Sequence, residues 1–112
     1  MVKKYIPVRG DVVWVDFDPV EGHEQGGRRP AIVISPEAYN KISKRALFCP
    51  ITSKKRGFIF EVPCVLAKID GVVLVDQVRT LDWGARKITF IERCLKVVAD
   101  EVEAKLRTLI HE

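Results

Sequence analysis

The feature that most limits the fold of this chain is a series of short apolar segments separated by turn-forming residues. The segments are rich in β-branched and aromatic residues, which is typical of strands. They span Asp11–Phe17, Ala31–Ser35, Arg45–Thr52, Phe58–Pro63, Gly71–Asp76 and Ile88–Leu95. Short strands at close spacing predict a strongly bent antiparallel sheet. Pro50 lies inside the third segment and predicts an edge or a bulge there, because proline has no N–H to donate.

Only the C-terminus has a clear helical pattern. From Asp100 onward, apolar residues recur at the i, i+4, i+7 and i+8 spacing of a helix face, at Val102, Leu106, Leu109 and Ile110. The shorter segment EAYNKIS, directly after Pro36, suits one or two helical turns. We therefore expect a mainly β chain with a C-terminal helix, and an SH3-like barrel with appended helices is the natural architecture.

The length and charge of the chain set only broad limits on its function. Its 112 residues fit a single domain, which we expect to cover residues 1–112. The 19 Lys and Arg residues exceed the 15 Asp and Glu residues, and the resulting charge of +4 weakly favours a polyanionic partner. No apolar run is long enough to span a bilayer, and the N-terminus lacks the apolar region of a signal peptide. We therefore expect a cytoplasmic protein without membrane contact.

The cysteines and histidines do not form a recognisable metal site. Cys49, Cys64 and Cys94 are odd in number, form no CxxC pair and lie in apolar, strand-like stretches. We expect them to be buried, reduced thiols. His23 and His111 are far apart in the sequence, and neither is near a cysteine. The sequence thus predicts no metal and no cofactor.

The segment between the first two predicted strands concentrates polar groups in a loop too long for a tight hairpin turn. It reads PVEGHEQGGRRP, from Pro19 to Pro30, and contains two acids, one histidine, one glutamine and two arginines. Long loops inside small domains are more often functional than short ones. On composition alone, however, a solvated loop whose charges only face water remains the simpler interpretation.

Three blocks of the sequence resemble the MazF/PemK/Kid toxin family, and the MazF branch most closely. They are WVDFDPVEGHEQGGRRPAIVISPEAYN (14–40), CPITSKKRGFIFEV (49–62) and DGVVLVDQVRTLDWGAR (70–86). Their order and spacing make the resemblance specific. It implies an SH3-like barrel of the MazF/Kid/CcdB type that forms a homodimer and cleaves single-stranded mRNA at specific sequences without a metal ion. It also implies a MazE-like antitoxin as partner, with any DNA binding only through the toxin–antitoxin complex.

The resemblance also implies a catalytic set. Arg29 falls at the family's RNA-site arginine, and a planar, always charged guanidinium suits phosphate oxygens. Glu24 matches a position tied to activity, where it would act as the general base or orient Arg29. Thr52 matches a hydroxyl position that would donate to a phosphate oxygen. Asp76 matches an aspartate of the catalytic set in the Kid branch, but Leu74 stands where that branch has an arginine. This departure shifts weight toward Glu24 and Arg29, and Asp76 would instead bind RNA or hold the scaffold of the site.

The remaining candidates would hold the RNA. A basic run from Lys54 to Arg56 precedes two phenylalanines, a pattern that suits a single-stranded backbone and a stacked base. We expect one of Phe58 and Phe60 in the core and at most one against a base. His23 is an accessory candidate, because a histidine side chain can both accept and donate a proton. The full RNA-binding set comprises His23, Gln25, Arg28, Ser53, Lys54, Lys55, Arg56, Phe58, Gln77 and Arg79.

Two other functions are compatible with this kind of fold. A CcdB-like toxin poisons gyrase by protein contact and uses a tryptophan close to the chain end, whereas the tryptophans here are Trp14 and Trp83. The other alternative is an SH3-like module that binds nucleic acid without cleaving it. The closeness of Glu24 and Arg29 in one loop favours an enzyme over both alternatives.

Overall fold

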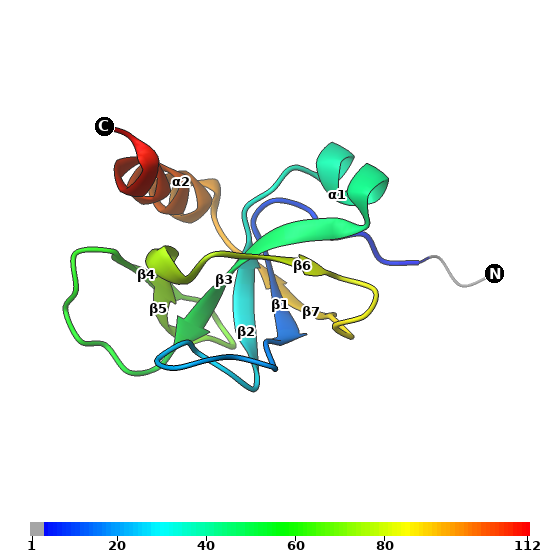
Figure 1. The fold of residues 1–112 in the computed structure, drawn as a ribbon. Coiled ribbons are helices and arrows are strands. Elements are labelled where there is room, and N and C mark those ends of the chain that lie inside the picture. The colour runs from blue at the N-terminus through cyan, green and yellow to red at the C-terminus, as the bar shows by residue number, and fades with distance from the viewer. Residues whose placement is uncertain (1–3) are drawn as a thin grey trace.

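The computed structural model describes residues 4–112, which are built around one curled antiparallel sheet (Figure 1). The strands and the 3-10 turn η1 are β1 (Asp11–Asp16), β2 (Arg28–Val33), β3 (Arg45–Thr52), β4 (Glu61–Val65), β5 (Asp70–Leu74), η1 (Val75–Gln77), β6 (Arg79–Asp82) and β7 (Thr89–Arg93). The helices are α1 (Glu37–Ser43) and α2 (Lys96–Ile110). The strand order is β4-β5-β3-β2-β1-β7, and β6 pairs with β3. The expected mainly β fold with a C-terminal helix is confirmed.

The central strand β3 changes its partner halfway along its length. On one side it pairs with β2, while on the other side residues 45–48 pair with β6 and residues 51–52 pair with β5. Pro50 lies in the gap between these two ladders, where a missing N–H leaves no strand partner unsatisfied. Of the expected edge or bulge, a full edge position is wrong, since β3 has neighbours on both sides, but Pro50 itself lies at a local break in pairing.

The two ends of the strand order approach each other, so the sheet is a half-barrel. The turn between β4 and β5 is held by Glu92 of β7, whose carboxylate accepts the backbone N–H groups of Ala67 at 3.0 Å and Lys68 at 2.8 Å. This contact joins β4 and β5, at one end of the strand order, to β7 at the other end. It also orders the turn that carries Lys68.

Both faces of the central strands are buried. Successive side chains of a strand point to opposite faces, so Val12 packs in one core cluster while Val13 packs in the other. The first cluster lies under α2, where Ala99 and Val102 are almost fully buried. The second cluster includes Phe48 and is shared by β6 and the segment that follows it.

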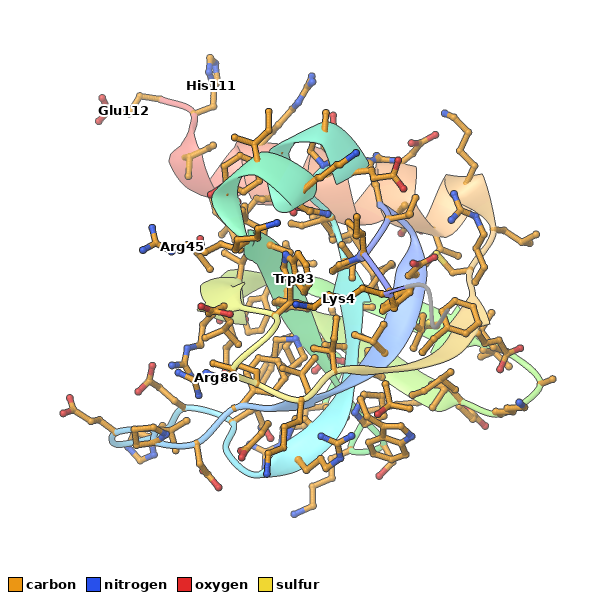
Figure 2. The ribbon with its side chains drawn as sticks, turned by 90° about the vertical axis from the view of Figure 1, so that its right-hand side faces the viewer. Lys4, Arg45, Trp83, Arg86, His111 and Glu112 are labelled. Atoms are coloured by element: carbon orange, nitrogen blue, oxygen red, sulfur yellow. The ribbon has the colours of Figure 1, made fainter. Side chains whose placement is uncertain are left out.

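The second core cluster is closed by Trp83, which Figure 2 places inside the molecule below α1. Its indole N–H donates to the backbone oxygen of Asn40 in α1, at 3.0 Å. His111 and Glu112 project outward beyond the end of α2 in the same view. Among the described residues, no helix is long and apolar enough to cross a membrane. Cys49, Cys64 and Cys94 are buried and free, as expected.

Several expected boundaries are wrong. The predicted strand from Ala31 begins at Arg28, because Arg28 and Arg29 pair with β1. The segment from Phe58 to Phe60 is a turn rather than the start of a strand, because the Glu61 N–H donates to the Phe58 oxygen at 3.1 Å. The last helix begins at Lys96, four residues before the apolar pattern was recognised. The strand Gly71–Asp76 ends at Leu74, and β6 was not expected at all.

Candidate active site

The long loop between β1 and β2 lies at the same edge of the sheet as the loop that follows β3 (Figure 1). Its base is closed by the Phe17 N–H, which donates to the Gly27 oxygen, and by the Gly27 N–H, which donates to the Asp18 carboxylate, both at 2.9 Å. Its tip is joined to η1, because the Gln25 N–H donates to Oε1 of Gln77 at 2.8 Å. The loop is thus attached at both its base and its tip.

Arg28 and Arg29 differ in their surroundings although they are neighbours. Arg28 is exposed and donates to the Lys87 oxygen at 3.0 Å and to Oγ1 of Thr89 at 3.1 Å. Arg29 is half-buried, and its Nε donates to the Gly26 oxygen at 2.9 Å. This bond uses the inner nitrogen of the guanidinium and leaves the outer NH₂ groups available for an anion. Both arginines belong to β2, so they point to opposite sides of the strand.

Arg29 lines the larger of two hollows at this edge, which we call the arginine hollow. It has a volume of about 460 Å³ and is lined by Arg29, Pro30, Ile51, Thr52, Ser53, Lys54, Lys68, Ile69 and Asp70. Four of the residues expected from the sequence meet here, namely Arg29, Thr52, Ser53 and Lys54. Lys68 and Asp70 were not expected from the sequence, because nothing local links the β4–β5 turn to the end of β3. The only available signal was a lysine in a turn.

The second hollow, the aromatic hollow, is smaller, at about 100 Å³. It is lined by His23, Gln25, Thr52, Lys54, Arg56, Phe58, Phe60, Glu61, Leu74 and Gln77. All but Phe60, Glu61 and Leu74 were expected to contact RNA. Thr52 and Lys54 line both hollows, so the two spaces adjoin at the end of β3.

The two phenylalanines of the aromatic hollow form a pair at its surface. Their ring centroids are 5.2 Å apart with an angle of 31° between the planes. Phe58 is 48% exposed, and Phe60 is partly buried without joining either core cluster. The expectation that one of them is a core residue is wrong, because the turn before β4 keeps both at the edge of the sheet.

Several expected site residues do not line either hollow. Glu24 is exposed, and its Oε1 accepts the Glu21 N–H at 2.7 Å. Arg79 donates to the Phe17 oxygen at 2.6 Å and so holds the start of the β1–β2 loop. Lys55 pairs with Asp70 across 3.0 Å at the rim of the arginine hollow. Arg28 lies on the other side of β2, as described above.

Asp76 lies in η1, directly before Gln77, and has an unusual environment for a surface carboxylate. Partial desolvation raises the pKa of the Asp76 carboxyl, and the negative charge of Glu61 adds to the rise. A carboxyl with a raised pKa holds its proton closer to neutral pH and is a better proton donor there. Within residues 4–112, no three His, Cys, Asp or Glu side chains are grouped so that they could hold a metal ion.

The comparisons with known proteins agree with this fold. The family model described as "PemK-like, MazF-like toxin of type II toxin-antitoxin system" matches residues 8–110. The endoribonuclease toxin MazF of Escherichia coli K12 is 42% identical over 110 residues, which cover 98% of this chain and 99% of the relative.

Solved structures give the same result. A crystal structure of MazF from Deinococcus radiodurans matches with a TM-score of 0.92 and 43% identity, over 97% of this chain and 100% of the other. A MazE–MazF crystal structure from the same organism matches with a TM-score of 0.84 and 44% identity, over 96% and 97%. The fold and these relatives together define a small toxin of the endoribonuclease class. The chain belongs to the family of PemK-like, MazF-like toxins of type II toxin–antitoxin systems.

Proposed function

We propose that this endoribonuclease cleaves single-stranded RNA, chiefly mRNA at specific sequences, with the scissile phosphate in the arginine hollow and a neighbouring base in the aromatic hollow. The observation that carries the proposal is that the two hollows adjoin at Thr52 and Lys54. A phosphate at Thr52 would meet Arg29 on one side, and a nucleotide linked to it would reach the phenylalanine pair on the other. Such proximity requires an extended, unpaired strand, whose bases are free to stack on aromatic rings.

In the proposed reaction, the ribose 2′-oxygen attacks the adjacent phosphorus. The new bond from the 2′-oxygen to phosphorus forms while the bond to the 5′-oxygen breaks, which leaves a 2′,3′-cyclic phosphate and a 5′-hydroxyl. A base takes the proton of the 2′-OH, and an acid supplies a proton to the leaving 5′-oxygen. Arg29 and the Thr52 hydroxyl stabilise the negative charge that develops on the phosphorus oxygens.

We assign the two proton transfers to Glu24 and Asp76. Neither carboxylate lines a hollow, but each adjoins in sequence a glutamine that does, Gln25 or Gln77. The 2.8 Å contact between these glutamines holds both segments beside the aromatic hollow. Glu24, on the exposed loop, is the general base. Asp76, whose pKa is raised by desolvation, is the general acid because it retains its proton closer to neutral pH. His23 lines the aromatic hollow and has an accessory role there.

The proposal includes a reaction without a divalent metal. The arginine hollow is lined by the cationic side chains of Arg29, Lys54 and Lys68 and by a single acid, Asp70, which is paired with Lys55. Nucleases that use two metal ions need several carboxylates that converge on the ions. Positive charge near the phosphate is instead supplied by the arginine and lysine side chains.

We further propose a cytoplasmic homodimer that a MazE-like antitoxin neutralises, with DNA contacts only through that complex. Support comes from large apolar side chains that are exposed in the single chain, including Ile59 at 89%, Val65 at 66% and Ile110 at 77%. Apolar surface of this kind is typical of interaction sites. Sedimentation at micromolar concentration tests the dimer, and a monomer under those conditions would contradict it.

One experiment tests the reaction itself. The purified protein is incubated, in excess EDTA, with an RNA that has one cleavage site carrying either ribose or 2′-deoxyribose. We expect cleavage of the ribose substrate only, with a cyclic phosphate on the 3′ end. Activity that requires magnesium, or that survives the deoxyribose substitution, would refute the mechanism. Bound but uncut RNA would support a binding module, and gyrase inhibition with intact RNA would support a CcdB-like toxin.

A further inference from the structure

The basic loop between β3 and β4, residues 53–60, has few contacts that determine its shape. Near its start, the Lys54 N–H donates to Oγ1 of Thr52 at 3.2 Å. Near its end, Lys105 of α2 donates to the Ile59 oxygen at 2.6 Å, and the Val75 N–H donates to the Phe60 oxygen at 3.3 Å. The middle of the loop carries Arg56, one of the cations of the aromatic hollow.

The Lys55 side chain pairs with Asp70, but the backbone in the middle of the loop is held by one carboxylate, that of Glu61, the first residue of β4. Its Oε2 accepts the Arg56 N–H at 3.3 Å, and its Oε1 accepts the Gly57 N–H at 3.1 Å. Glu61 is only 9% exposed. Both carboxylate oxygens are therefore committed to the backbone of a single turn. Gly57 allows this turn because its φ of +75° lies in the left-handed region.

The charge of Glu61 cannot be explained as a contribution to RNA affinity. Glu61 lines the aromatic hollow, where its negative charge would repel a phosphate and weaken the attraction of Lys54 and Arg56. A nearly buried carboxylate that opposes the surrounding charge needs another reason to be there. The two backbone N–H groups supply it, because a carboxylate is the side chain that can accept from both at once.

We propose that Glu61 is a positioning residue for RNA binding. Its carboxylate holds the turn at Arg56 and Gly57 so that Lys54, Arg56 and Phe58 face the RNA. The inference rests on the proposed function, since it assumes that the basic loop contacts the substrate. It assigns no chemical step to Glu61, so its loss affects binding of the RNA rather than the cleavage of bound RNA.

The decisive variant is Glu61→Gln. Glutamine has nearly the same shape but offers one oxygen, so its NH₂ group would face one of the two N–H donors. We expect KM for single-stranded RNA to rise about tenfold. Because the Glu61 charge adds to the raised pKa of Asp76, kcat is compared at the pH optimum of each protein, where it should change less than about twofold. A purely electrostatic role predicts the opposite sign, because removing a negative charge from a basic surface tightens RNA binding. The charge-matched control is Glu103→Gln on α2, which lines neither hollow and should leave KM unchanged.

A second variant perturbs the same turn without any change in charge. Gly57→Ala meets no atom within 4 Å, so its effect is confined to the strain of a left-handed backbone. We expect the same rise in KM as for Glu61→Gln. Circular dichroism and thermal unfolding show whether each variant is folded under the assay conditions. If Glu61→Gln does not fold, Gly57→Ala alone decides the question.

A double variant, Lys54→Ala with Arg56→Ala, separates this inference from the proposed function. If it binds RNA as tightly as the wild type, the basic loop is not an RNA surface and the proposed function fails in that part. If it weakens binding while Gly57→Ala and a folded Glu61→Gln do not, only the positioning role of Glu61 is refuted. Similar rises in KM for all three variants support both.

Discussion

Replacing Arg29 with alanine should separate catalysis from stability. The structure gives the Arg29 side chain one hydrogen bond within the protein, from its Nε to the Gly26 oxygen. A bond of this kind contributes about 1 kcal/mol net to the free energy of unfolding, which corresponds to a decrease in Tm of about 4–8 °C for a small domain. The lost stabilisation of the phosphate charge should lower kcat by about 100- to 1000-fold, or about 2.7–4 kcal/mol.

Arg28 offers a matched comparison one position earlier in the same strand. Arg28→Ala removes the same charge but two hydrogen bonds, to Lys87 and Thr89. We therefore expect a stability loss of about 1–2 kcal/mol and, because Arg28 lines neither hollow, a change in kcat of less than about threefold.

The assay measures initial cleavage rates of a short single-stranded RNA at saturating concentration, well below the Tm of both variants. Thermal unfolding by circular dichroism gives the stability of each variant on the same preparation. The expected pattern is crossed, with the larger loss of rate at Arg29 and the larger loss of stability at Arg28. Wild-type kcat in folded Arg29→Ala, or equal losses of kcat in the two variants, would refute the assignment of Arg29 to the phosphate.

Three further predictions concern packing, salt and pH. A Cβ at Gly71 would lie 2.5 Å from the backbone oxygen of Thr52. Gly71→Ala should therefore lower the free energy of unfolding, measured in urea, by about 1–3 kcal/mol and reduce the cleavage rate by displacing Thr52. Gly84→Ala, where the new Cβ would lie 3.4 Å from its nearest atom, is the control. RNA binding should weaken with salt at a log–log slope of about −3, as about four phosphate contacts to a single strand require, and a slope near zero would contradict the basic surface. Burial raises the pKa of the Cys49 thiol to about 12 and that of Cys64 to about 11. Because the fold favours the neutral thiols, their contribution to the free energy of unfolding should be intact below about pH 9 and should decline as the pH rises toward these pKa values. Iodoacetamide at pH 8 should modify neither cysteine in the native protein and both in denaturant, as mass spectrometry would show.

The sequence was sufficient where local chemistry determines local structure. Helix α1 and strand β3 have the expected bounds, because Pro36 starts the helix and β-branched residues dominate the strand. Strand β6 was missed because it is short and polar, with only Leu81 buried. Its strand conformation depends on pairing with β3, a contact between residues more than 30 positions apart that no local pattern reports.

The site was predicted in its residue types but not in its arrangement. Arg29 and Thr52 were chosen from the resemblance, and both line the arginine hollow. Lys68 was not chosen, because its position depends on the contact between its N–H and Glu92 on the last strand. Glu61 was not chosen either, since nothing in the local sequence distinguishes an acid before a valine from an ordinary strand residue. Its role depends on which N–H groups its carboxylate reaches.

The register of two strands explains why Arg29, and not Arg28, belongs to the hollow. Ala31 of β2 lies opposite Pro50 of β3. The paired ladder ends there, but its register, continued by opposite steps, directs Arg29 toward Thr52, and both residues line the arginine hollow. Opposite residues of an antiparallel pair share a face. The sheet itself therefore directs a guanidinium and a hydroxyl to the same hollow.

This arrangement depends on the break in pairing at Pro50. The β3–β6 ladder ends at Phe48 and the β3–β5 ladder begins at Ile51, so the sheet changes its edge partner just before Thr52. A slip of one residue between β2 and β3 would place Pro30 or Arg28 opposite Thr52 and would also turn Ile32 out of the core cluster under α2. The burial that fixes the register of β2 thus also selects the arginine that faces the substrate.

Core substitutions at Ile32 should for this reason reduce kcat by more than the loss of folded protein explains. Parallel measurements of cleavage rate and of unfolding on Ile32→Ala would reveal the difference. A loss of rate that matches the loss of folded protein would show that the site does not depend on this register.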